Sequence, residues 1–143
     1  MSAQNGDVVK IGGFELRFLV DETQSSGNVV VFEFAIPPNG RVPAAHYHKD
    51  VDEVVYGLEG TMTSTLGDKK YELRNGDSLF IPRGSVHTHE NFGTDTAKAL
   101  AVLTPGSIGR KYFEEIGEAV NVPGKPDIEK IKEIMLRHGL VPA

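Results

Sequence analysis

Two early segments of the chain have the hydrophobic pattern of β-strands. From Phe14 to Val20, apolar residues fall at every second position, which is the period of a half-buried strand. Residues 28–36, NVVVFEFAI, are rich in β-branched and aromatic residues and are bounded by Ser-Ser-Gly and Pro-Pro-Asn-Gly. This second segment therefore predicts a more deeply buried strand.

The next part of the chain has short apolar stretches separated by turn signals. Gly67-Asp68 lies between TMTSTL and KKYEL, and Asn75-Gly76 precedes DSLFI. Both dipeptides tolerate the positive φ of a two-residue hairpin loop, so we expect a hairpin at each. Pro82 favours a further turn, and residues 96–104 predict a last strand. About nine short strands with tight turns indicate an all-β antiparallel barrel or sandwich of the jelly-roll type.

After Pro105 the pattern changes from strand to helix. Residues 109–120, GRKYFEEIGEAV, predict a short helix, and residues 127–139 predict a stronger one. Asp127 can cap this second helix, Gly139 suits its C-terminal end, and four apolar residues share one face: Ile128, Ile131, Ile134 and Met135. We expect the helices to pack outside the barrel or to cover its mouth.

Length and composition limit the classes of protein to consider. The 143 residues fit a single domain, 1–143, with a barrel over about residues 8–105 and a helical appendage over about 108–139. Because the chain has no cysteine, any metal must be held by nitrogen and oxygen. Acidic residues outnumber basic ones by 20 to 15 and the basic residues are scattered, which argues against nucleic acid as a partner.

The same composition indicates a cytoplasmic protein without a membrane partner. The first ten residues lack the apolar core of a signal peptide. No apolar stretch approaches the roughly 18 residues that cross a membrane. The expected partner is a small-molecule substrate.

Four residues in the middle of the chain predict a metal site. His46 and His48 are two apart, so on a strand both imidazoles point to one face. Glu53 could return a carboxylate to the same place, and His87 could lie on a neighbouring strand. Three imidazoles and one carboxylate suit one divalent transition metal, Fe, Mn, Co, Ni, Cu or Zn, and leave positions open for substrate, water or dioxygen.

Several other residues near these four have two possible interpretations. His89 could contact the metal ligands or the substrate, or it could be a partly exposed histidine near a strand end. His138 would complement the dipole of the last helix, without a catalytic role. Arg41 and Arg83 could meet an anionic substrate, although solvated surface is the favoured interpretation. Five apolar side chains could line a pocket beside the metal: Phe32, Phe34, Met62, Phe80 and Phe92.

Two longer motifs contain the predicted ligands. The first is G-x5-H-x-H-x4-E-x6-G, from Gly40 to Gly60, and the second is G-x5-P-x-G-x2-H-x3-N, from Gly76 to Asn91, with 15 residues between them. The chain thereby resembles the single-domain members of the cupin superfamily. The resemblance implies a double-stranded β-helix, or jelly-roll barrel, with one metal bound by His46, His48, Glu53 and His87. It also implies a homodimer.

The resemblance leaves the reaction open among several classes. Our first hypothesis is a metal-dependent oxygenase, similar to the quercetin dioxygenase-like cupins, that acts on a small enolisable molecule with Glu53 as the catalytic base. A metal-assisted isomerase or lyase and a non-catalytic small-molecule-binding protein are the alternatives. A flavonol-sized substrate is not expected, because the C-terminal helices could narrow the mouth of the single short barrel.

Overall fold

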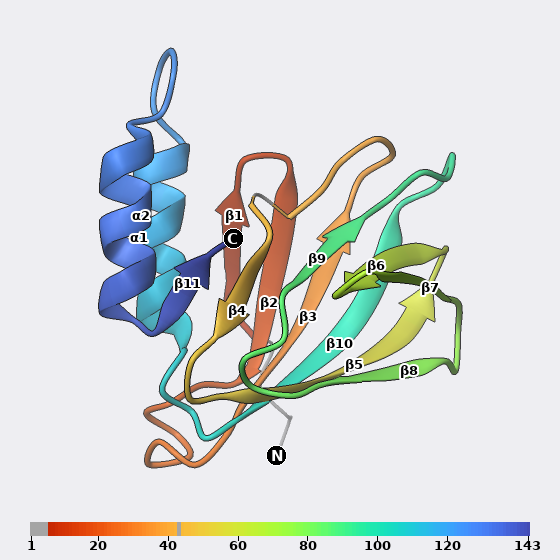
Figure 1. Cartoon of the computed structure of the whole chain (residues 1–143), viewed down its shortest axis with the longest axis horizontal. Helices are drawn as coiled ribbons and strands as arrows, with labels where there is room; N and C mark the ends of the chain where they lie inside the picture. The colour runs from red at the N-terminus through yellow and green to blue at the C-terminus, as the bar shows by residue number, and fades with distance from the viewer. Residues whose placement is uncertain (1–5, 43) are drawn as a thin grey trace.

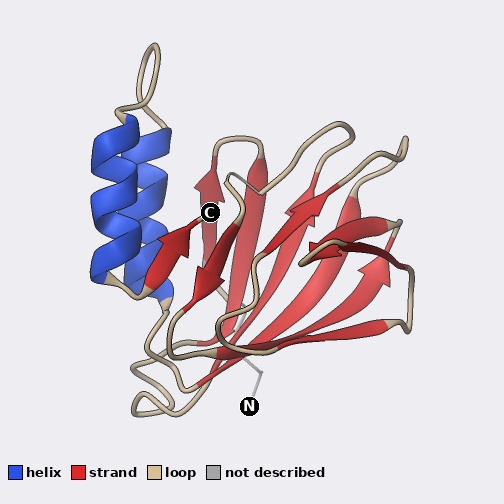
Figure 2. Ribbon diagram, viewed as in Figure 1, coloured by secondary structure: helices blue, strands red, loops and turns tan. Residues whose placement is uncertain are grey.

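Two antiparallel β-sheets face each other, and two helices stand at one end of them (Figures 1 and 2). The structure is a computed structural model that describes residues 6–42 and 44–143. Within these ranges the first sheet has the order β1 (Val8–Ile11), β2 (Phe14–Val20), β3 (Val30–Ile36), β10 (Ala97–Thr104), β5 (Asp52–Glu59) and β8 (Ser78–Ile81). The second has the order β11 (Leu140–Pro142), β4 (His46–His48), β9 (His87–Glu90), β6 (Met62–Leu66) and β7 (Lys69–Leu73). The predicted all-β, jelly-roll class is confirmed.

The alternating pattern places the core between the two sheets. Phe14, Leu16 and Phe18 of β2 are buried, while the residues between them are exposed, as the sequence predicted. The rings of Phe18 and Phe32 lie 5.6 Å apart and join β2 to β3 in this core. The buried side chains of the neighbouring β10 are small at three alternate positions, Ala97, Ala99 and Ala101. The aromatic side chains of β2 and β3 therefore fill much of the interior, whereas the small alanine side chains of β10 take up little of it.

The described residues form eleven strands, two more than the sequence indicated. The additional strands are β1 and β11, which have four and three residues. Segments this short show no clear period of two, and only their pairing with β2 and β4 makes them strands. The pairing of β11 matters for the site, because β4 carries His46 and His48.

One of the two predicted hairpins is confirmed and the other is wrong. Gly67-Asp68 joins β6 to β7, and Gly67 has a φ of 62°. Asn75-Gly76 instead lies where the chain crosses between sheets, because β7 belongs to the second sheet and β8 pairs with β5 in the first. Gly76 has a φ of 90°, so the dipeptide predicted the backbone conformation but not the partner of the following strand.

The helices are α1 (Arg110–Val120) and α2 (Ile128–Arg137), close to the predicted ranges. The Asp127 side chain caps α2 by accepting hydrogen bonds from the backbone N–H groups of Glu129 and Lys130, as expected. Of the four predicted apolar positions, Ile134 and Met135 are buried and Ile131 is partly buried, but Ile128 is 57% exposed. In the described part of the chain, neither helix has the length and apolar character needed to span a bilayer.

Candidate metal centre

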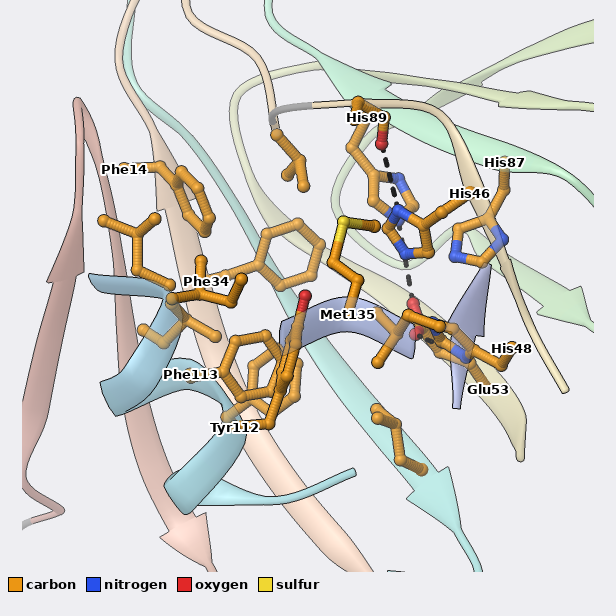
Figure 3. A pocket seen from close by; sticks show the side chains of 18 of the residues that line it. Phe14, Phe34, His46, His48, Glu53, His87, His89, Tyr112, Phe113 and Met135 are labelled. Carbon is orange, nitrogen blue, oxygen red and sulfur yellow. Dashed lines mark hydrogen bonds and ion pairs between the residues drawn. The ribbon is translucent and has the colours of Figure 1, made fainter. Parts of the chain in front are cut away.

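The four predicted ligands come from both sheets and meet between them (Figure 3). His46 and His48 stand on β4, and His87 stands on the adjacent β9, where its Cα is the register partner of His46. Glu53 is the second residue of β5, in the facing sheet. Residues two apart on a strand share a face, so the H-x-H spacing directs both imidazoles of β4 toward Glu53.

The side-chain atoms of this cluster are close enough to share one ion. One potential ligand atom from each of His46, His48 and His87 lies within 4.8 Å of the others, and the same holds for Glu53, His87 and His89. All five residues are buried. The cluster thus contains the whole predicted set and also His89. The interpretation of His89 as a partly exposed residue is wrong, because it is 5% exposed.

Backbone carbonyl groups orient two of the imidazoles. The Nδ1 atom of His46 lies 3.0 Å from the Ala44 carbonyl oxygen, and the Nδ1 atom of His87 lies 2.9 Å from that of Ser85. A carbonyl can only accept, so each Nδ1 carries the proton and donates it. The Nε2 atom of each ring then has a free lone pair, which is the arrangement found in metal-binding histidines.

The other two histidines differ in what their nitrogens contact. His48 Nδ1 is buried and has no hydrogen-bond partner among the described residues, and it lies 3.9 Å from Glu53 Oε1. In His89, Nδ1 lies 2.7 Å from Ser64 Oγ and Nε2 lies 3.6 Å from Glu53 Oε2. A buried nitrogen without a partner is costly. A cation held by His48 and its neighbours would remove that cost, so the donor set fits a transition metal.

Burial makes the imidazoles of His46, His48 and His87 poor bases in the folded chain. It is the main cause that lowers the pKa of His46, His48 and His87 to about 4, and the proximity of the other histidines lowers each pKa further. Neutral imidazoles are the form that binds a metal. The three side chains are therefore ready to coordinate at neutral pH without first losing protons.

The Glu53 carboxylate stays ionised in spite of its burial. Burial alone would raise its pKa, but the contact with His89 and the nearby imidazoles of His48 and His87 lower it, and the net pKa lies below the ordinary value. At neutral pH the negatively charged Glu53 carboxylate therefore lies beside the neutral imidazoles of His46, His48 and His87. This is an environment that favours a cation.

An apolar pocket of about 100 Å³ opens beside the cluster. Its wall comes mainly from β2, β3, α1 and α2, so the helices cover this end of the sandwich, one of the two arrangements that we expected (Figure 3). Phe32 and Phe34 line it as predicted, but Phe80 and Phe92 are 56% and 63% exposed and Met62 is buried elsewhere. The sequence missed the α1 and α2 residues of the wall, because nothing local shows where a helix docks.

The remaining residues singled out in the sequence lie outside the cluster. The Arg83 guanidinium forms an ion pair with Asp52, and both side chains are solvent-accessible, which agrees with surface as the favoured interpretation. His138 follows α2, and its Nε2 atom lies 3.3 Å from Glu115 Oε2. Asn91 is buried, and its amide donates to the carbonyl groups of Ile36 and Asp95. Its role is to hold two loops together.

The fold and the cluster define a class of protein: a jelly-roll barrel with a His/Glu group that could bind a metal. Comparison with known families agrees. The Cupin_2 family profile, described as Cupin domain, matches residues 32–103, which is half of the chain. The chain belongs to this family.

Relatives of known sequence cover different parts of the chain. It is 27% identical over 118 residues to the quercetin 2,3-dioxygenase of Bacillus subtilis, covering 82% of this chain and 34% of that enzyme. It is 37% identical over 71 residues to an uncharacterized protein of Methanocaldococcus jannaschii, covering 50% of this chain and 57% of that protein. The chain thus spans about a third and somewhat over half of the lengths of these two relatives.

Solved structures show the same fold. A predicted oxalate decarboxylase from Thermotoga maritima has a TM-score of 0.64 at 22% identity, covering 73% of this chain and 99% of that one. At this identity the likeness concerns the fold, and the chemistry has to be argued from the site.

Proposed function

We propose that the protein is a metal-dependent cupin enzyme, an oxygenase that acts on a small enolisable organic molecule. The main support for the proposal is that the His/Glu cluster lies directly beside the apolar pocket. The similarity to a quercetin 2,3-dioxygenase over most of the chain supports oxygen chemistry in preference to the other reactions found on this fold.

The contacts within the cluster favour His46, His48, His87 and Glu53 as the ligands. His46 and His87 keep a free Nε2 lone pair, and His48 has a nitrogen without a partner. His89 differs, since one of its nitrogens faces Ser64 and the other faces Glu53. Its role is to hold the Glu53 carboxylate in position. A divalent metal bound there would supply a Lewis acid with open positions for substrate and dioxygen.

Glu53 is the residue we assign as catalytic base. Its Oε2 atom faces His89, so Oε1, on the side of His48, is the atom that would accept the proton. The lowered pKa keeps the carboxylate ionised at neutral pH but also makes it a weak base. A weak base suits a substrate whose proton is already acidic, as in an enol or a phenol.

The test is oxygen consumption by protein reconstituted with iron, manganese, nickel, cobalt or copper and supplied with catechols and other enolisable compounds. We expect oxygen uptake that depends on both metal and substrate. The Glu53→Gln variant should lose about 100-fold or more of this rate, because it lacks both the negative charge and the proton acceptor. Glu59→Gln, at the exposed end of the same strand, is the matched control and should retain the wild-type rate.

Two results would contradict parts of the proposal. A Glu53→Gln variant that keeps its metal and its full turnover would remove the base role. Conversion of substrate without oxygen uptake would replace the oxygenase with a metal-assisted isomerase or lyase, in which the same cluster would hold the metal.

A further inference from the structure

One side chain from α1 interrupts the apolar wall of the pocket. Apart from the cluster itself, Tyr112 is the single polar side chain among the described residues that line the pocket. Figure 3 shows its ring rising from α1 with the hydroxyl oxygen directed into the pocket. The ring is held by Phe113 and His138, whose centroids lie 5.0 and 5.3 Å from its own.

The hydroxyl group of Tyr112 has no evident structural purpose. The residue as a whole is 5% exposed, and its hydroxyl makes no hydrogen bond with the described part of the chain. The oxygen is not sealed inside the protein, because His48 Nδ1 is the one fully buried polar side-chain atom without a partner among the described residues, and Tyr112 borders the open space of the pocket. A phenylalanine would provide the same ring packing, so packing does not account for the hydroxyl. The position of the group therefore points to a partner that enters from outside.

The hydroxyl is suited to donate a hydrogen bond. Burial raises the pKa of Tyr112, so the group keeps its proton at any pH at which the protein would work. The nearby wall, formed by residues such as Phe34, Phe113 and Met135, offers an incoming molecule only apolar contact. A molecule that spans the pocket thus meets a metal-binding cluster at one end and a single donor elsewhere in the wall.

We propose that Tyr112 is a specificity-determining residue that donates a hydrogen bond to the part of the substrate remote from the metal cluster. The inference rests on the proposed function and deepens it, because it defines the substrate as a compact, largely apolar ring. Two neighbouring oxygens at one end of this ring would reach the cluster, and a hydrogen-bond acceptor at the other would reach Tyr112. Catechols with an acceptor opposite the two hydroxyls fit this description.

The size of the pocket agrees with a substrate of one ring. A cavity of roughly 150 Å³ lined by Leu, Ile and Phe admits benzene. The pocket beside the cluster has about 100 Å³ and an open side. The enclosed space is therefore suited to a compact compound of about one ring that places one end at the cluster, and it is too small to enclose a three-ring flavonol.

Two probes distinguish a hydrogen bond from the Tyr112 hydroxyl from the packing of its ring against the ligand. Catechol has the neighbouring oxygens alone, and 4-nitrocatechol adds an acceptor on the opposite side of the ring. Both would be titrated into wild-type protein and the Tyr112→Phe variant, each loaded with Co²⁺. We expect the variant to bind 4-nitrocatechol about 3- to 10-fold more weakly and catechol within twofold of wild type, the change expected for one neutral hydrogen bond. Tyr71→Phe, on the exposed face of β7, should change neither affinity.

The remaining outcomes overturn the inference in distinguishable ways. If Tyr112→Phe changes both affinities equally, or changes neither, the hydroxyl does not contact the acceptor. If wild-type protein holds Co²⁺ but binds neither probe, the substrate class is wrong while the metal site stands. If it holds no Co²⁺, the proposed function fails as well. The thermal midpoint of Tyr112→Phe should stay close to that of wild type, because the variant keeps the ring contacts and removes no hydrogen bond within the described part of the chain.

Discussion

Three histidines of the cluster are held neutral by burial between the two sheets. His46, His48 and His87 are each less than 10% exposed, and their pKa values fall to about 4. An unfolded chain has no such burial, so its histidines titrate near 6.5. Between these two values the unfolded state binds more protons than the folded state. The stability of the metal-free protein must therefore depend on pH in this range.

We predict that the metal-free protein is fully stabilised by these residues above about pH 6.5 and loses that stability as the pH falls toward 4. Each pKa unit is worth about 1.4 kcal/mol, so a drop to pH 5 should cost on the order of 2 kcal/mol per buried histidine. Urea unfolding at pH 7, 6 and 5 measures this. Glu53 does not mask the effect. Its pKa is lowered, so its contribution to the stability of the folded state is lost only at pH values below the ordinary pKa of a carboxyl group.

A control identifies the histidines responsible for that slope. The His87→Gln variant removes one of the three lowered pKa values, so its free energy of unfolding should change less between pH 7 and 5 than that of wild type. A wild-type free energy of unfolding that does not change between pH 7 and 5 would show that His46, His48 and His87 are not held neutral by burial.

Individual residues also show which features of the site could be predicted from the sequence and which could not. The spacing of His46 and His48 and the two glycine-bracketed motifs predicted which side chains gather, because strand geometry alone decides which residues share a face. Ser64 and Tyr112 were not predicted to contact the site. Ser64 meets His89 across a strand pairing 25 residues apart, and Tyr112 reaches the pocket through the docking of a helix. Neither contact produces a recognisable pattern in the local sequence.

The helix α1 is the element that brings Tyr112 and Phe113 to the pocket, and its first turn is capped from a distance. The residue before it, Gly109, has no side chain to cap the helix. Instead, Glu22 Oε1 and Oε2 accept hydrogen bonds from the backbone N–H groups of Arg110 and Lys111, at 2.9 and 3.2 Å. The sequence predicted the helix but not this cap, because the two segments are 88 residues apart.

We predict that Glu22→Ala lowers the free energy of unfolding by about 1 kcal/mol, because it leaves two N–H groups of α1 without acceptors and removes a negative charge from the helix N-terminus. The loss should appear as faster hydrogen exchange in the first turn of α1. Glu118→Ala, on the exposed side of the same helix, is the matched control and should change the stability by less than about 0.5 kcal/mol. Equal stability of the two variants would show that Glu22 does not cap α1.

Sheets and helices also differ in how well they could be predicted. The alternation over Phe14–Val20 gave a strand that the structure reproduces residue by residue, and Asp127 marked the start of α2. Asn75-Gly76 had the conformation of a turn but led into the other sheet. A turn signal describes φ and ψ over a few residues, whereas the choice of partner strand depends on contacts far along the chain.

At the scale of the whole molecule, the site exists only where three parts meet. One sheet contributes the histidines, the facing sheet contributes Glu53, and the helices close the apolar pocket beside them (Figure 3). The strand β11, which follows α2, pairs with β4 and so connects the helices to the strand that carries His46 and His48. The proposed function requires that this meeting point holds one transition metal.

The most direct test is the metal content of protein purified without chelators or a nickel column, compared with a His46→Ala/His48→Ala double variant. We predict close to one transition-metal ion per chain in the wild type and almost none in the double variant. His138→Ala is the control and should retain the metal. A folded wild-type protein that takes up no metal, even after reconstitution, would contradict the account and leave a barrel that binds small molecules without one.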